Sequence, residues 1–197
     1  MGTGLTETQK TDTPITASKH GDVAREASLS LVEPKGDTLV AKTVTINRPR
    51  EELYDYWRNL ERLPSFMENI ERVEALGEKR YRWVVKAPAG HMVEWVALVT
   101  EEKAGEYIAW TADEGAEIAN SGRVDFRDAP GGRGTWVTAT ILYDPPAGII
   151  GKAVAKLFQR EPAIQVRRDL RRFKQLMETG EVATAAWTKA QLAEEND

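Results

Sequence analysis

Side chains with the chemistry of a catalyst are scarce in this 197-residue chain. It contains no cysteine and two histidines, which excludes thiolate nucleophiles, disulfides and cysteine-based zinc sites. His20 falls in a polar N-terminal stretch, and His91 follows the turn residues Ala89 and Gly90, so both imidazoles are interpreted as solvated. Neither histidine is predicted to take part in catalysis.

The carboxylates offer no better set. Glu94 precedes Trp95 in a predicted strand with two apolar faces, so the direction of its side chain is left open. Asp125 alternates onto the outer face of its strand together with Arg123 and Arg127. No pair of carboxylates, Ser-His-Asp set or metal-ligating cluster can be assembled from these residues. We therefore predict no catalytic residue, no metal site and no cofactor.

Aromatic side chains give a clearer signal, because they recur in every middle strand of the predicted sheet. Tyr81, Trp83 and Val85 alternate with other residues and so share the inward face of one strand. Asn120 and Gly122 fall on an otherwise apolar face, where an unpaired amide in a dry core costs about 1–3 kcal/mol. This favours a cavity beside them; a locally satisfied bulge, with the tryptophans as plain core packing, is the alternative.

The side chains predicted to line this cavity come from strands and helices alike. They are Trp57, Phe66, Tyr81, Trp83, Trp95, Trp110, Asn120, Phe126, Ile141, Tyr143, Phe158, Val166, Leu170 and Phe173.

A long helix, Pro162–Met177, is predicted to cover the apolar face of the sheet. Its apolar residues Val166, Leu170, Phe173 and Met177 recur at steps of four, three and four and therefore share one side. Pro162 suits a first helical turn, and Gly180 lies just beyond the end, where helices commonly stop at glycine. A stripe of this kind must be buried against another layer, and the upstream strands are the surface large enough to do so.

The other side of this helix is strongly basic. Arginine occupies positions 167, 168, 171 and 172, with Asp169 and Glu178 close enough in sequence to pair with them. We interpret this side as a solvated, ion-paired surface. Binding of an anionic partner is the alternative.

The elements before this helix follow a recognisable order. A β-branched strand at Thr38–Ile46 precedes two short helices, and glycine-rich or proline-rich turns then separate six further strands. The helices are expected at Arg50–Asn59 and Glu61–Met67, and the strands at Ile70–Leu76, Tyr81–Lys86, Met92–Glu101, Tyr107–Ala112, Ala116–Arg127 and Gly134–Tyr143.

This order resembles the helix-grip fold of the START-like (SRPBCC) superfamily, which includes polyketide cyclases/dehydrases and coenzyme Q-binding proteins. The resemblance rests on VTINRPREELYDYWRNLERLPSFMENIERVE at Val44–Glu74, VEWVALVTEEKAGEYIAW at Val93–Trp110, GRVDF at Gly122–Phe126 and DLRRFKQLMETGE at Asp169–Glu181. It implies an α+β fold in which a curved antiparallel sheet of about seven strands wraps around the C-terminal helix. Such proteins share a cavity and differ in what fills it, so the fold does not name the ligand.

The segment between the last strand and the C-terminal helix, 144–158, is a candidate lid. In the resembling family this segment often closes one mouth of the cavity, so the resemblance implies the same here. The segment also has the pattern of a short cationic amphipathic helix, and a second hypothesis gives 147–158 peripheral contact with a membrane surface. Ordinary packing on the sheet rim is the alternative. The residues in question are Ile149, Ile150, Lys152 and Lys156.

Composition bounds the organisation and the partners of the chain. The pattern predicts a disordered or weakly ordered tail at 1–36, one helix-grip domain at 37–180 and a C-terminal tail at 181–197. The net charge of −4 argues against a nucleic-acid partner. Because neither a membrane-spanning apolar run nor a signal-peptide pattern is visible, we expect a cytoplasmic location, with membrane contact at the inner face as the further hypothesis.

Three functions remain open at this stage. The first is binding of a lipophilic small molecule such as a lipid or quinone, with transport of that molecule as an extension. The second is a cyclase/dehydrase-type enzyme acting on a polyketide-like substrate, which would require Tyr81, Glu94, Asn120 and Tyr143 to converge in one pocket. The third is a protein-interaction module with a vestigial cavity, which gains if the aromatic side chains fill the interior. The thin supply of acid–base groups favours binding over catalysis, and oligomeric state is not predicted.

Overall fold

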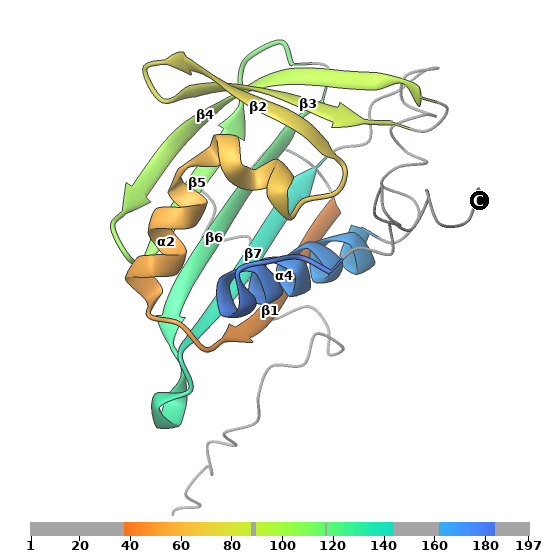
Figure 1. The fold of residues 1–197 in the computed structure, drawn as a ribbon. Coiled ribbons are helices and arrows are strands. Elements are labelled where there is room, and N and C mark those ends of the chain that lie inside the picture. Colours follow the sequence, from red (N-terminus) through yellow and green to blue (C-terminus); the bar gives the residue numbers. More distant parts are fainter. Residues whose placement is uncertain (1–37, 88–89, 117, 144–161, 184–197) are drawn as a thin grey trace, which may run out of the picture.

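The computed structural model describes residues 38–87, 90–116, 118–143 and 162–183. Seven strands form one antiparallel sheet in the order β1-β7-β6-β5-β4-β3-β2. The strands are β1 (Thr38–Ile46), β2 (Ile70–Gly77), β3 (Arg80–Lys86), β4 (Met92–Lys103), β5 (Tyr107–Ala112), β6 (Asn120–Asp128) and β7 (Thr135–Tyr143). The sheet curves, and its helices lie on one side of it (Figure 1).

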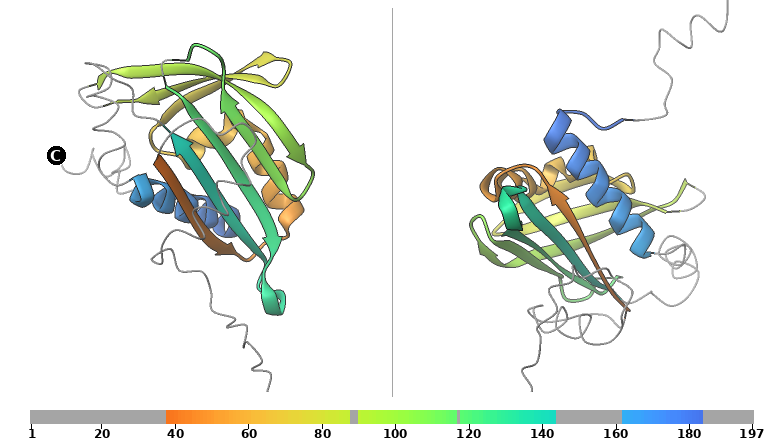
Figure 2. Two further views of the ribbon diagram at one scale, coloured as in Figure 1. Left: turned by 180° about the vertical axis from the view of Figure 1, so that it is seen from behind. Right: turned by 90° about the horizontal axis from the view of Figure 1, so that it is seen from below.

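Three helical elements cover the concave face of this sheet. They are α2 (Arg50–Arg58), the 3₁₀ helix η1 (Leu60–Ser65) and α4 (Pro162–Thr179), while a short 3₁₀ turn, η3 (Pro130–Gly132), joins β6 to β7. Seen from behind, the sheet lies in front of all three (Figure 2). The α+β helix-grip fold predicted from the sequence is therefore confirmed.

Helix α4 buries the predicted stripe. Val166, Leu170, Phe173 and Met177 are all buried. Gly180 ends the helix in the left-handed region at φ 84°, and its N–H donates to the Leu176 carbonyl at 2.8 Å.

The C-terminal end of α4 is tied to the end of β1 by polar contacts. Lys174 Nζ donates to the Thr45 carbonyl and to Glu178 Oε1, both at 2.7 Å, and the Asn47 N–H donates to the same Glu178 oxygen at 2.7 Å. Arg48 Nε donates to the Met177 carbonyl at 2.7 Å. The predicted pairing of Glu178 with the arginine side of α4 was therefore wrong, because the Glu178 carboxylate accepts from Lys174 and from the Asn47 N–H.

Local differences from the expected elements have simple causes. The second short helix is a 3₁₀ helix that stops at Ser65, because Pro64 lies within it and supplies no N–H. Strand β6 begins at Asn120 and not at Ala116, because the chain bends at Ile118. Strand β4 runs on to Lys103 past an irregularity between Val99 and Glu101.

No helix in the described ranges combines the length and the apolar character that crossing a membrane needs.

Candidate functional site: a cavity between the sheet and the C-terminal helix

A cavity of about 160 Å³ lies between the concave face of the sheet and the N-terminal half of α4. Apolar side chains dominate its walls, and the polar exceptions are Asn69, Asn120, Gln165 and Asp169. The full lining is Val40, Trp57, Leu60, Leu63, Met67, Asn69, Ile70, Trp83, Val85, Trp95, Trp110, Ile118, Asn120, Ala139, Ile141, Gln165, Val166, Asp169 and Leu170. The aromatic side chains therefore leave part of the interior open, which counts against the interaction-module hypothesis.

Many of the side chains predicted to line a cavity do border this one. They are Trp57, Trp83, Trp95, Trp110, Asn120, Ile141, Val166 and Leu170. They come from α2, from the strands β3 to β7 and from α4, which the sheet topology brings together.

Three predicted phenylalanines lie elsewhere, in a tightly packed part of the core. Phe66, Phe126 and Phe173 are almost completely buried and do not line the cavity. Their rings surround Trp57, with centroids 5.3, 6.3 and 5.0 Å from that of the indole. Strand alternation placed Phe126 on the inward face and the helical stripe did the same for Phe173, but neither pattern could show that three helical elements close over this end of the sheet.

The remaining predicted residues either do not line the cavity or lie outside the described residues. The Tyr81 hydroxyl accepts a hydrogen bond from Arg58 Nη1 at 3.1 Å, and the residue does not line the cavity. Tyr143 pairs with Thr38 on β1 and with Asn120 on β6. The lining residue Phe158 and the lid and membrane-contact residues Ile149, Ile150, Lys152 and Lys156 lie outside the described residues.

Three of the four tryptophans that border the cavity form a row on the strands β3, β4 and β5. Trp83 and Trp95 are register partners on β3 and β4, and their rings lie 6.2 Å apart at 11°. Trp110 on β5 lies 6.3 Å from Trp83 at 21°. The indole nitrogens of Trp83 and Trp95 are buried without a hydrogen-bond partner among the described residues. We call Trp83, Trp95 and Trp110 the indole row.

Gly122 explains how Trp110 can lie against the sheet. The two residues are register partners on β5 and β6, and a Cβ at Gly122 would collide with three atoms of the Trp110 ring. The bare backbone at this position therefore gives the indole its place. Asn120, the other unusual residue of this strand, borders the cavity and also donates locally from Nδ2 to the Ile118 carbonyl at 3.3 Å.

Asp169 is a cavity-lining residue that the sequence pattern misplaced. It was expected to pair with arginines on the solvated side of α4, but it borders the cavity. Gln165 Nε2, one helical turn earlier, donates to Asp169 Oδ1 at 2.9 Å. Burial raises the pKa of Asp169 to about 7, against the hydrogen bond from Gln165, the backbone N–H of Glu68 and the charge of Arg172, which all lower it.

The other carboxylates considered from the sequence stay outside the cavity. Glu94 is exposed, and Asp125 pairs with Arg123 at 2.9 Å on the outer face, where the Arg123 guanidinium also lies over the Tyr107 ring. His91 is exposed, as expected. Within the described residues, no group of three His, Asp or Glu side chains could hold a metal ion.

Comparison with known proteins shows which family has this sequence and fold. Residues 46–171 match the model of a family described as polyketide cyclase / dehydrase and lipid transport. The chain belongs to this family. The START-like assignment made from the sequence is thereby confirmed, and at this coarse level the fold is one used for hydrophobic ligands.

Individual relatives of the family agree with this assignment. A solved protein of Deinococcus radiodurans is 44% identical, with a TM-score of 0.60, and the match covers 73% of this chain and 99% of that one. An uncharacterized 17.2 kDa protein of Streptomyces lincolnensis is 29% identical over 152 residues, 77% of this chain and 97% of its own. The ZhuI aromatase/cyclase of Streptomyces sp. R1128 shares the fold, at 16% identity and a TM-score of 0.56, over 74% of this chain and 99% of its own.

Proposed function

We propose that the protein binds a lipophilic small molecule in the cavity between the sheet and α4. The observation that carries the proposal is the cavity itself, which is walled by apolar side chains on both the sheet and the helix. Burying apolar surface there gains about 25 cal/mol per Å². A volume of about 160 Å³ is of the order of the apolar cavity of roughly 150 Å³ that holds a benzene ring.

The indole row favours a ligand with a flat ring over a plain acyl chain. Its three rings are within about 20° of parallel, at 11° and 21°. Aromatic rings gain about 0.5–1.5 kcal/mol from an offset-stacked or edge-to-face neighbour beyond the area they bury. A quinone or a polyketide-like ring system therefore fits the wall better than a saturated lipid tail does.

The first test is native mass spectrometry of the protein purified from its own host, followed by organic extraction. We expect a stoichiometric ring-bearing lipophile in the extract. Ala139→Phe places a ring in the cavity from β7 and should abolish the bound mass, with circular dichroism confirming that the variant is folded. A protein that carries nothing and shows no thermal shift with a library of lipophiles would overturn the proposal.

A second candidate function, a cyclase/dehydrase-type reaction, is favoured by one observation. Asp169 borders the cavity with its pKa raised by burial to about 7, so its carboxyl can both hold and release a proton at neutral pH. The set that the sequence suggested for an enzyme does not converge, because Glu94 is exposed and Tyr81 contacts Arg58. If Asp169 transfers protons, extracts of the wild type should contain a product of water elimination or ring closure, and Asp169→Asn should retain the bound compound without forming that product.

The cytoplasmic location, the membrane contact through 147–158 and the lack of a nucleic-acid partner stay predictions. The geometry of the cavity does not bear on these three predictions.

A further inference from the structure

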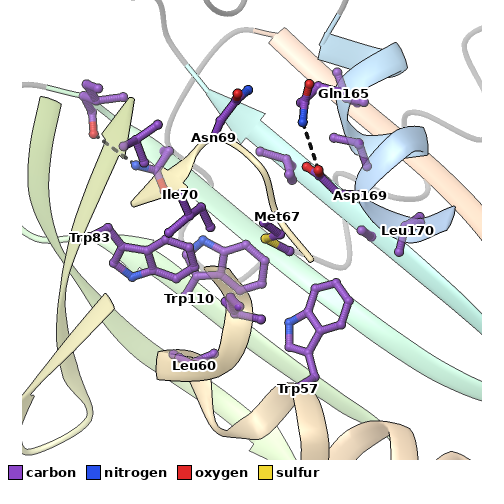
Figure 3. Close-up of a pocket in the computed structure, with 18 of the residues that line it drawn as sticks. Trp57, Leu60, Met67, Asn69, Ile70, Trp83, Trp110, Gln165, Asp169 and Leu170 are labelled. Carbon is purple, nitrogen blue, oxygen red and sulfur yellow. Dashed lines mark hydrogen bonds between the residues drawn. The ribbon is translucent and has the colours of Figure 1, made fainter. Parts of the chain in front are cut away.

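Three of the four polar side chains of the cavity gather at one end, while the fourth, Asn120 on β6, donates to the Ile118 carbonyl. Gln165 and Asp169 project from α4 on one side, and Asn69 projects from the turn before β2 (Figure 3). Trp83 and Trp110 lie away from Gln165 and Asp169 in the same view. The cavity therefore has a polar end, formed by Asn69, Gln165 and Asp169, and an indole end.

Hydrogen-bonding capacity remains at the polar end after the internal contact is made. Gln165 Nε2 donates one N–H to Asp169 Oδ1 at 2.9 Å, and a side-chain amide nitrogen carries two N–H groups. A carboxylate has about four acceptor positions on its two oxygens. The pair can thus accept and donate at the same time to a third group placed beside it.

The charges around Asp169 come from its own helix and from the turn before β2. Arg172 on α4 attracts the carboxylate, and the Glu68 carboxylate opposes it, while the backbone N–H of Glu68 donates to Asp169. Glu68 in turn lies 3.8 Å from Arg168 and 3.6 Å from Arg172. Among the described residues that line the cavity, only Asp169 is ionisable.

We propose that the polar end is a head-group subsite for a hydroxyl group carried by an otherwise apolar ligand, with Asp169 as its acceptor. This inference rests on the proposed binding function and adds the ligand's polar group. A hydroxyl donates to Asp169 and accepts from the amide N–H of Gln165 or Asn69, so it satisfies both kinds of group at once. A carbonyl offers only acceptors, and an anionic head would face Asp169 and Glu68 together.

The test uses two probes of nearly equal shape, 2-naphthol and 2-methylnaphthalene, which differ in a hydroxyl and a methyl group. Isothermal titration calorimetry of the full chain gives the ratio of their dissociation constants. Asp169→Leu should shift this ratio toward 2-methylnaphthalene by about tenfold or more, since the hydroxyl loses a charge-assisted bond. Asp169→Asn, which preserves the shape of the side chain, should shift it in the same direction by a smaller factor. Asp128→Asn, an exposed carboxylate on β6, should leave the ratio unchanged.

The pH profile separates a hydroxyl subsite from a merely polar wall. A hydroxyl that donates to the carboxylate favours the ionised form, so 2-naphthol should bind more tightly as pH rises from 6 to 8, while 2-methylnaphthalene should not. Both Asp169 variants should remove this slope.

The possible failures are distinguishable. If 2-methylnaphthalene binds the wild type but the ratio is the same in Asp169→Leu and the pH profile is flat, the head-group subsite is overturned and the proposed function stands. If the pH slope for 2-naphthol has the opposite sign, Asp169 acts as a donor to an acceptor and the hydroxyl assignment is overturned. If neither probe binds, the proposed function fails for ring-sized ligands, and the subsite fails with it.

Discussion

Two aromatic clusters share the concave face of the sheet and are packed in different ways. In the packed cluster, Trp57, Phe66, Phe126 and Phe173 are at most 1% exposed, and their ring centroids lie 4.7 to 6.3 Å apart at mostly steep angles. In the indole row, the rings are nearly parallel, lie 6.2 and 6.3 Å apart and border the cavity. Trp57 stands at the boundary, because it also borders the cavity, but the three phenylalanines around it form a dry core, whereas the indole row forms a cavity wall.

The difference follows from which elements carry the rings. The packed cluster draws Trp57 from α2, Phe126 from β6 and Phe173 from α4, with Phe66 just after η1, so the rings meet from several directions and interlock. The indole row comes from three successive strands of one sheet. Trp83 lies 6.2 Å from Trp95 on the adjacent strand and 6.3 Å from Trp110 two strands away, and all three border the same cavity. Because these rings are nearly parallel, they do not interlock with one another, and they leave the space in front of them open. That space is the cavity.

Phe173→Ala should give the largest loss of stability, because it removes the ring that contacts both Trp57 and Phe66 in the packed cluster. We expect a decrease of about 3–5 kcal/mol in the free energy of unfolding, measured by urea titration. The matched variant on the cavity side is Ile141→Ala, which borders space already open and should cost half as much or less. Equal losses would show that the two regions are packed alike.

Gly122→Ala tests how the indole row is held against the sheet. The added methyl group collides with the Trp110 ring, which must turn away toward the cavity. We expect a loss of about 1–3 kcal/mol, as for other overpacked sites, and weaker binding of any ring-sized probe. In a protein that already carries Trp110→Ala, the further change Gly122→Ala should cost little stability, because the ring that the methyl group would strike is absent. If Gly122→Ala costs the same stability with and without the Trp110 ring, Gly122 is required for a reason other than contact with Trp110.

The fold was predictable from local patterns because they agree with the tertiary structure. Strand Thr38–Ile46 is confirmed residue by residue, since it is rich in β-branched side chains and contains neither glycine nor proline. The stripe of α4 and its stop at Gly180 are confirmed for the same reason. Pro64 marked an interruption but not the change of helix type.

The site was harder to predict, because alternation gives the face of a residue and not what lies opposite. Trp83 and Phe126 both point inward, yet one borders the cavity and the other is sealed by helices. Asp169 was misplaced because four arginines surround it in the sequence and suggest a solvated surface. One signal was available: Gln165 and Asp169 are four residues apart, directly beside Val166 and Leu170 on the helix surface, at the border of the apolar stripe.

Asp169→Asn should stabilise the protein at high pH, in contrast to substitutions in either aromatic cluster. Burial raises the pKa of Asp169 from its ordinary 3.8 to about 7 in the folded state. Below about pH 3 the carboxyl is protonated in both states. Between about pH 4 and 7 it is ionised in the unfolded state but largely protonated in the folded state, so the wild type loses stability as pH rises. The loss is complete above about pH 7. We expect the variant to exceed the wild type by about 1–2 kcal/mol at pH 8 and to lose this advantage by pH 4.

Urea titrations at pH 4, 6 and 8 measure this effect. Asp128→Asn is the control, because its carboxylate is exposed and should show no such trend. An advantage of the same size at every pH would mean that the carboxyl of Asp169 is already solvated in the folded protein.

Trp83→Phe should have the smallest effect, although Trp83 is buried and central to the indole row. The substitution removes apolar ring area but also removes an indole N–H that has no partner among the described residues. A buried donor without a partner costs about 1–3 kcal/mol, so its removal offsets most of the lost packing. We expect a net change within about 1 kcal/mol by urea titration. A loss above about 2 kcal/mol would show that the Trp83 N–H is bonded in solution, and the indole row would then carry a polar contact that the packed cluster lacks.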